Sequence, residues 1–256
     1  MRVLVISFVA AVIGACLLCG RVSAQAGGSP DNDELARSIL EKADQVRFPS
    51  HGFEVLVTIT STGGNASPEP RKYRILSKGN ENTIITATEP ASERGQILLM
   101  KGRDLWVFLP AVSQPVRLGL AQRLTGQVAN GDLARANFAG DYQPRLLRTE
   151  EIDGESVYVL ELNAIDRSVT YHRVLYWVRQ SNFWPQKAEF YSLSDRLLRT
   201  CMYEDFRTLG GRPRPTRLVM QDALRSGEES VLEYSDMRLR DLADKIFTKD
   251  YLKRLE

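Results

Sequence analysis

The residue types that most often catalyse reactions or bind metals are few in this chain of 256 residues. Its two histidines, His51 and His172, lie in different halves of the chain, and neither has a second ligand at the spacing of a zinc site. The sequence contains no GxSxG nucleophile elbow, no GxGxxG turn and no Walker loop. A structural or surface role is the better interpretation of both histidines, so we expect no metal site.

One cysteine and three acidic pairs remain as sources of chemistry. Cys201 lies in the alternating stretch LLRTCMYEDF, where a small buried side chain is its commoner use. Adjacent side chains in a strand point to opposite faces, which separates the two carboxylates of each acidic pair. The pairs are Glu150-Glu151, Glu204-Asp205 and Glu228-Glu229. We expect no enzyme, no catalytic residue and no cofactor; carboxylates that meet across strands are the one catalytic arrangement left open.

The most distinctive stretch is apolar. GQILLMKGRDLWVFLPAV, residues 95–112, is interrupted only by the turn-like KGRD. It predicts two strands joined by a short turn, with Trp106 and Phe108 on one side of the second strand. We expect these aromatic side chains to share a face with Leu98 and Met100 and to meet a ligand there. The alternative is that the whole stretch is ordinary core.

The first residues have the layout of a secretory signal peptide. MRVLVISFVAAVIGACLLCGRVSAQA combines an early arginine, an apolar run and two small-residue cleavage sites. We expect cleavage after Ala24 or Ala26, with residues 1–24 as the signal peptide and residues 25–256 as a single domain. Two alternatives stay open. The apolar run could be an uncleaved membrane anchor, or IGAC could be a lipobox in which Cys16 is lipidated.

The charge balance argues against a nucleic-acid partner. The chain has 34 basic and 32 acidic residues, and loss of Arg2 and Arg21 with the signal peptide leaves 32 − 32 = 0. Phosphate contacts to nucleic acid need a basic excess. From Arg94 to Arg148, however, eight basic residues stand against three acidic ones. This local excess suits an anionic partner, lipid headgroups or a solvated strand face.

Periodicity predicts one helix followed by many strands. Apolar residues at helical spacing predict an amphipathic helix over residues 33–47. From Phe53 the period changes to two, which places Val55 and Val57 on one face of a strand. Further strands, with hairpin-sized breaks, are expected at 71–77, 83–88, 96–100, 104–109, 114–118, 145–151, 156–163, 172–179, 186–192, 197–207, 216–221 and 229–239.

Residues 119–141 interrupt this series of strands and short turns. The segment is rich in Ala, Gly and Asn, and we expect a long excursion between two blocks of strands. Apolar side chains of this excursion and of the first helix are the candidates for a lid over the sheet: Leu35, Ile39, Leu124, Leu133 and Phe138. The tail predicts a last short helix capped by Thr248.

Several strands carry bulky apolar residues on both faces. Core packing explains many of them, but one helix and one Ala/Gly-rich excursion are little cover for about a dozen strands, which leaves room for an apolar ligand groove. The candidates for the lining of that cavity are Val55, Val57, Leu98, Met100, Trp106, Phe108, Leu160, Tyr176 and Met220.

A series of short motifs follows one another along the chain. The first are LWVFLP at 105–110, Arg117 in a basic strand, Thr125-Gly126, Gly131-Asp132-Leu133, and Asp141-Tyr142 before a new strand. VYVLEL, VLYWVRQSNFWPQKAEFYSLSDRLLRT and PRPTRLVMQD come later. Each motif alone is weak, but their order, over residues 33–240, resembles the outer-membrane lipoprotein-sorting protein family, the LolA-like group.

The resemblance implies a mainly β fold, an unclosed and strongly curved antiparallel β half-barrel of about 11–13 strands with a helical lid. It implies a periplasmic carrier that holds acyl chains of a lipoprotein or lipid in an apolar cavity and ferries them between inner and outer membrane. Its partners would be an inner-membrane transporter and an outer-membrane acceptor, and we expect a monomer. The chain is more similar to the broad branch of the family, and no single residue matches the arginine that locks the general carrier's lid.

A second function is compatible with the same resemblance. A periplasmic lipoprotein or lipid sensor, or a regulatory binding module, can be built on the same half-barrel. Such regulators carry a further domain after the half-barrel, whereas this sequence ends at Glu256, soon after the last predicted strand. We therefore expect the carrier and keep the sensor as the alternative.

Overall fold

The computed structural model describes residues 30–64, 67, 69–79, 81–110, 112, 114–135 and 137–252. The predicted signal peptide and Cys16 lie outside these residues. The helices are α1 (Pro30–Arg47), α2 (Asn130–Ala134), α3 (Phe138–Asp141) and α4 (Lys249–Leu252), with a 3-10 turn at Asp244–Ile246. The strands are β1 (Phe53–Thr62), β2 (Arg71–Lys78), β3 (Asn82–Glu89), β4 (Ile97–Lys101), β5 (Asp104–Phe108), β6 (Val116–Leu118), β7 (Arg123–Thr125), β8 (Val128–Ala129), β9 (Tyr142–Ile152), β10 (Glu155–Ala164), β11 (Arg173–Arg179), β12 (Pro185–Tyr191), β13 (Leu197–Leu209), β14 (Arg212–Asp222) and β15 (Glu229–Leu239).

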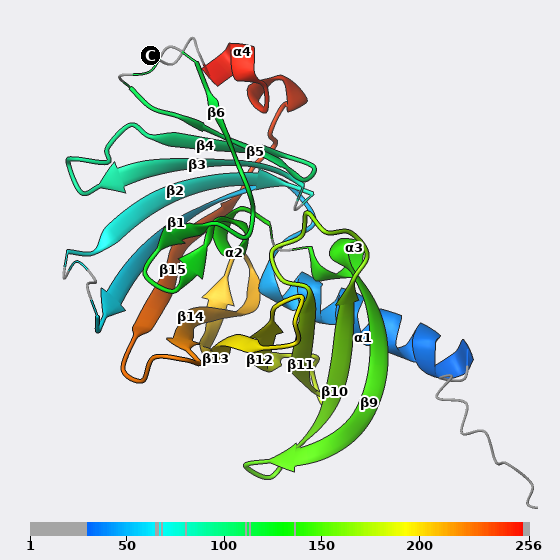
Figure 1. Ribbon diagram of the computed structural model, residues 1–256. Coiled ribbons are helices and arrows are strands. Elements are labelled where there is room, and N and C mark those ends of the chain that lie inside the picture. Colours follow the sequence, from blue (N-terminus) through cyan, green and yellow to red (C-terminus); the bar gives the residue numbers. More distant parts are fainter. Residues whose placement is uncertain are drawn as a thin grey trace, which may run out of the picture.

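Within the described residues, thirteen strands form one antiparallel sheet, and β7 pairs only with β8. The order is β6-β5-β4-β3-β2-β1-β15-β14-β13-β12-β11-β10-β9. Most neighbours in the sheet are neighbours in sequence, but β1 pairs with β15 and so joins the two halves of the chain. β6 and β9 stay at opposite edges, and the sheet curves without closing (Figure 1). The predicted unclosed antiparallel half-barrel is confirmed.

Alternation along each strand decides which face is buried. In β1, Val55 and Val57 are buried, whereas Leu56 between them is exposed. Val57 lies opposite Tyr73 of β2 on one side and Tyr234 of β15 on the other. Directly opposite residues share a face, so the buried surface continues across all three strands. This concave face carries the main apolar core.

Helix α1 packs on the same core through one stripe. Ala36, Ile39, Leu40 and Ala43 recur every three or four residues and are fully buried. Leu35 lies off this stripe and is 42% exposed, contrary to its predicted place in the lid. Since successive helical residues are about 100° apart, the residue before Ala36 faces solvent.

The hairpin β4–β5 corrects one sequence prediction. The two-residue turn Gly102-Arg103 makes Lys101 and Asp104 direct partners across the hairpin. Each even-numbered residue of one strand therefore lies opposite an odd-numbered residue of the other strand. Its register places Leu98 opposite Val107 and Met100 opposite Leu105, whereas Leu99 is opposite Trp106 and Ile97 is opposite Phe108. Trp106 and Phe108 thus lie on the face opposite to Leu98 and Met100. The expectation that all four share one face is wrong, because alternation within each strand does not fix the register across a turn.

The convex face of this hairpin is covered by residues from 242–252. Phe108 and Leu99 pack there with Phe247 and Leu252, and Trp106 lies at the edge of this cluster. The backbone N–H of Tyr251 donates to the Thr248 hydroxyl at 3.2 Å, which confirms the predicted cap. The aromatic side of β5 therefore packs on the segment that contains the C-terminal helix α4. Figure 1 draws this helix in red, near β5 and β6.

Strand β14 begins earlier than predicted. The sequence predicts a strand from residue 216, yet Pro213 and Pro215 already pair with β13. Pairing with β15 starts only at Arg217, so the first part of β14 has a free side where a missing N–H is tolerated.

No helix of the described residues has the length and apolarity needed to cross a bilayer.

Candidate functional site

The concave face gathers most of the residues predicted to line a cavity. Seven of them belong to one buried apolar cluster: Val55, Val57, Leu98, Met100, Leu160, Tyr176 and Met220. They come from strands in both halves of the sheet, which the β1–β15 pairing brings together. Trp106 and Phe108 are separated from them on the convex face. That the seven contact a ligand stays a prediction.

The predicted excursion covers this face. We call its described residues, 119–135 and 137–141, the cover segment; it contains the hairpin β7–β8 and the helices α2 and α3 and lies within the curve of the sheet (Figure 1). Leu133 and Phe138 are buried in the core cluster, and Leu124 is half-buried against it. With Ile39 of α1, four of the five predicted lid residues therefore pack on the concave face.

A buried ion pair holds the cover segment to the β4–β5 turn. Arg135 contacts both carboxylate oxygens of Asp141, at 2.5 and 2.8 Å, and its Nη1 donates to the carbonyl of Gly102 at 2.9 Å. Arg103 adds a second contact to Asp141 at 3.2 Å. Both partners of the Arg135–Asp141 pair are almost fully buried. Removal of Arg135 would leave the buried Asp141 with Arg103 as its remaining ionic contact. Removal of Asp141 would leave the buried Arg135 with only a 3.9 Å contact to the exposed Glu81.

A second attachment joins the cover segment to α1. The Asp44 carboxylate accepts a hydrogen bond from the backbone N–H of Ala139 at 2.7 Å, and Arg37 donates to the Ala139 carbonyl at 2.5 Å. Burial raises the pKa of Asp44 to about 6, against the opposing effects of Arg47 and the Ala139 N–H. The Arg47 guanidinium lies 4.1 Å from the Phe138 ring centre and so reaches from α1 to α3.

Asp132 makes a third attachment, between α2 and the sheet. Its carboxylate accepts from the Tyr171 hydroxyl at 2.8 Å and from the backbone N–H of Ala129 at 2.7 Å, and Arg199 of β13 lies 3.6 Å away. Burial raises the pKa of Asp132, and Arg199 opposes this shift. The cover segment thus rests on apolar contacts but is fixed in place by a few polar ones.

The space between the α2–α3 part of the cover segment and the sheet is small. A cavity of about 30 Å³ lies there, and the side chains that line it include Arg47, Phe138, Cys201, Tyr203, Met220 and Leu232. This volume holds about one water molecule. Burial raises the pKa of the Cys201 thiol, which keeps the group protonated and unreactive. The described residues contain no group of three His, Cys, Asp or Glu arranged to hold a metal.

Sequence reasoning missed the polar residues of this site. Asp44 and Arg47 follow Leu40 and Ala43 by four positions each and so extend the buried stripe of α1. Charges in an apolar stripe are a signal that could have identified them. No comparable signal identifies the Arg135–Asp141 pair, because its partners meet through the fold of the cover segment.

Comparisons with known proteins place this architecture in a family. A family model described as an uncharacterized protein matches residues 79–254. A LolA superfamily protein from Nitrosomonas europaea is 67% identical over 84% of this chain and 98% of its own, with a TM-score of 0.81. None of the curated proteins compared with the chain matches it.

Two more distant structures share the fold. One is a domain of a putative outer membrane lipoprotein-sorting protein from Vibrio parahaemolyticus, with 21% identity, a TM-score of 0.74 and coverage of 87% of this chain and 100% of that one. The other is a DUF1329 family protein from Desulfovibrio piger, with 23% identity, the same TM-score of 0.74 and coverage of 86% and 99%. Sequence identity and fold together show that this chain belongs to the LolA superfamily.

Proposed function

We propose that the protein is a periplasmic carrier that binds acyl chains of a lipoprotein or lipid under the cover segment. The observation that carries the proposal is an apolar concave face closed by a segment that a few ion pairs and hydrogen bonds hold in place. The name of the related Vibrio structure, an outer membrane lipoprotein-sorting domain, supports the same activity. Export by a signal peptide at residues 1–24, followed by a single domain, is part of this proposal.

Binding requires the cover segment to move. Pockets for small molecules usually measure about 300–1,000 Å³, far more than the cavity of about 30 Å³ beneath α2 and α3. Displacement of α2 and α3 would uncover apolar side chains such as Leu160 and Tyr176, which an acyl chain could then cover instead of water. Each buried CH2 group contributes about 0.8 kcal/mol, so a long chain can offset the loss of the contacts made by the cover segment.

Release of the cargo is the reverse of this step, in which the cover segment replaces the acyl chain on the concave face. When the cover segment returns, it competes with the acyl chain for the concave face, and its polar attachments to α1 and the β4–β5 turn form again. A carrier with this balance can take up cargo from an inner-membrane transporter and deliver it to an outer-membrane acceptor. We propose these two partners and a monomeric carrier.

Lipid retention by the mature protein tests this function. After native purification, extraction and mass spectrometry should find acyl lipids, and a fluorescent fatty-acyl probe should bind. Met220→Trp, which fills the cavity beneath the cover segment, should reduce probe binding. Met202→Trp, on an exposed position of the neighbouring strand, is the matched control and should not. Absence of both extracted lipid and probe binding in the folded wild type would refute the proposal.

A further inference from the structure

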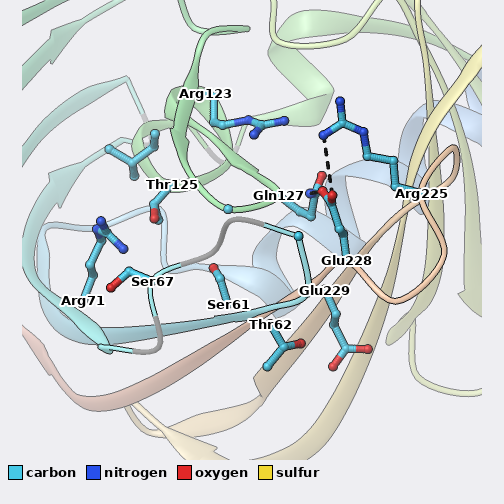
Figure 2. Close-up of a pocket in the computed structure, with 14 residues that line it drawn as sticks. Ser61, Thr62, Ser67, Arg71, Arg123, Thr125, Gln127, Arg225, Glu228 and Glu229 are labelled. Carbon is cyan, nitrogen blue, oxygen red and sulfur yellow. Dashed lines mark hydrogen bonds and ion pairs between the residues drawn. The ribbon is translucent and has the colours of Figure 1, made fainter.

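A second, polar pocket lies at one end of the half-barrel. It has a volume of about 370 Å³ and is formed by the end of β1 with the loop after it, the hairpin β7–β8 and the hairpin β14–β15 (Figure 2). We call it the rim pocket. Three arginines and two glutamates line it: Arg71, Arg123, Arg225, Glu228 and Glu229.

Some charged side chains of the rim pocket have a close partner of opposite charge or a hydrogen-bond donor, and others do not. Arg71 is paired with Glu93 at 3.0 Å, and Glu229 accepts from the Gln221 side chain at 3.0 Å. Arg123 has no hydrogen bond or ion pair with any side chain of the described residues. The contact of Arg225 with Glu228 is long, at 3.5 Å.

Two of these cations face one another. In the view of Figure 2 the guanidinium groups of Arg123 and Arg225 point toward each other across the top of the pocket, the Glu228 carboxylate lies below them in contact with Arg225, and Glu229 points away from both. An anion that entered between them would form charge-assisted hydrogen bonds with both guanidinium groups. Guanidinium groups match the oxygen spacing of a phosphate, to which each can donate two hydrogen bonds.

The wall beneath the arginines is fixed by polar contacts. The backbone N–H of Gln127 donates to the Ser230 hydroxyl at 2.9 Å, and the Ser61 and Ser230 hydroxyls lie 2.8 Å apart. The Gln127 side chain is 3% exposed and donates to Glu228 at 2.9 Å, but its Oε1 has no partner among the described residues.

The rim pocket adjoins the proposed acyl site. Leu124, between Arg123 and the turn of the hairpin, lines the rim pocket and also packs on the core cluster. Val128, on the other strand of the same hairpin, is fully buried in that cluster. One hairpin of the cover segment therefore contacts the apolar face on one side and the polar pocket on the other.

We propose that the rim pocket binds the phosphate group of the cargo lipid between Arg123 and Arg225. This inference rests on the proposed acyl-chain binding and specifies the class of cargo as a phosphate-bearing lipid. With the acyl chains under the cover segment, the headgroup would lie at the end of the half-barrel, where the two arginines replace part of its hydration. A neutral lipid with the same acyl chains lacks these contacts.

The test compares two lipids that differ only in phosphate. Fluorescent phosphatidic acid and diacylglycerol with identical acyl chains are presented in non-ionic detergent micelles, and their affinities for the mature protein are measured. We expect a preference of about tenfold or more for phosphatidic acid. Arg123→Gln and Arg225→Gln should each reduce this preference several-fold and leave diacylglycerol binding unchanged.

A matched control separates the pocket from overall charge. Arg207 is 73% exposed and pairs with an aspartate at 3.5 Å, much as Arg225 is 65% exposed and pairs with a glutamate at 3.5 Å. Arg207 precedes the β13–β14 turn, at the other end of β14 from Arg225. Arg207→Gln should keep the full preference, and an equal loss in this variant would overturn the inference.

The outcomes distinguish the two proposals. If the wild type binds both lipids equally, the phosphate site is refuted while acyl-chain binding stands. If it binds neither, the proposed function itself fails. Inorganic phosphate identifies the source of the anion: competition with phosphatidic acid but not with diacylglycerol supports the headgroup site. Phosphate binding that depends on Arg123 without any preference for phosphatidic acid would mean that the pocket takes free phosphate, which overturns the lipid assignment.

Discussion

The carboxylate of Asp44 accepts a hydrogen bond from the backbone N–H of Ala139 at 2.7 Å and so joins the end of α1 to the first turn of α3. Asp44 is fixed on a long helix in the core, whereas Ala139 belongs to the cover segment. The bond therefore links the static part of the molecule to the part that we propose to move. Arg47, one turn further along α1, supplies the countercharge at 3.4 Å.

The titration of Asp44 gives a prediction for stability. Its pKa is 3.8 when exposed, and burial raises the pKa to about 6 in the folded protein. Between these two pH values the folded state binds more protons than the unfolded state. The stabilisation of the folded state by Asp44 is therefore fully present below about pH 4 and is lost as the pH rises through about 6. The difference in free energy of unfolding between wild type and Asp44→Asn should fall by on the order of 3 kcal/mol over this range.

Denaturant unfolding of both proteins at a series of pH values measures this difference. Asp132, whose pKa is also raised by burial, is present in both proteins, so its titration largely cancels. A difference that stays constant from acidic to neutral pH would contradict the prediction.

The Arg135–Asp141 pair should control opening of the cover segment. Asp141→Asn leaves Arg135 buried without a full countercharge, which should cost about 3 kcal/mol of stability. The fluorescent acyl probe should enter faster, because the cover segment loses the ion pair between Asp141 and Arg103 of the β4–β5 turn. Stopped-flow fluorescence measures the entry rate below the unfolding transition.

Asp205→Asn is the control for this pair. Asp205 also pairs with an arginine, but the pair is exposed, so its loss should change stability by less than about 0.5 kcal/mol. Its probe entry rate should equal that of the wild type. Equal entry rates in Asp141→Asn and Asp205→Asn would show that the buried pair does not restrain the cover segment.

The strand count followed from local patterns, whereas the unclosed sheet was implied by the resemblance to the LolA-like group. Alternation in segments such as 53–60 and turn residues such as Asp153-Gly154 report on short-range geometry, which one sequence records well. The register between strands depends on turn geometry, and for this reason the face of Trp106 and Phe108 was predicted wrongly. Contacts between distant segments, such as Asp44 with Ala139, depend on the complete fold and leave little trace in local sequence.

The rim pocket depends on the conformation of Gly126. This residue has φ of +50°, and a Cβ there would lie 2.1 Å from the Ser61 hydroxyl oxygen and 2.3 Å from that of Ser230. Gly126→Ala should therefore displace the hairpin β7–β8 and remove the preference for phosphatidic acid. The combined strain and overlap should cost about 2 kcal/mol or more of stability.

Gly154→Ala separates backbone strain from steric overlap. Gly154 has φ of +77°, and a Cβ there would meet nothing within 4 Å. Its substitution should cost only about 1 kcal/mol for the left-handed backbone and leave lipid preference unchanged. Gly126→Ala with no greater effect than Gly154→Ala on either measurement would mean that the hairpin does not define the pocket.

The two faces of the β4–β5 hairpin should respond differently to truncation. Met100 is fully buried on the concave face, so Met100→Ala should weaken binding of the acyl probe and cost about 2–4 kcal/mol of stability. Trp106 lies on the convex face, where Lys249 sits 4.0 Å above its ring. Trp106→Ala should loosen α4, seen as faster amide exchange at residues 249–252, and leave probe binding intact. Loss of probe binding in Trp106→Ala but not in Met100→Ala, with both variants folded, would place the ligand on the convex face and reverse the assignment.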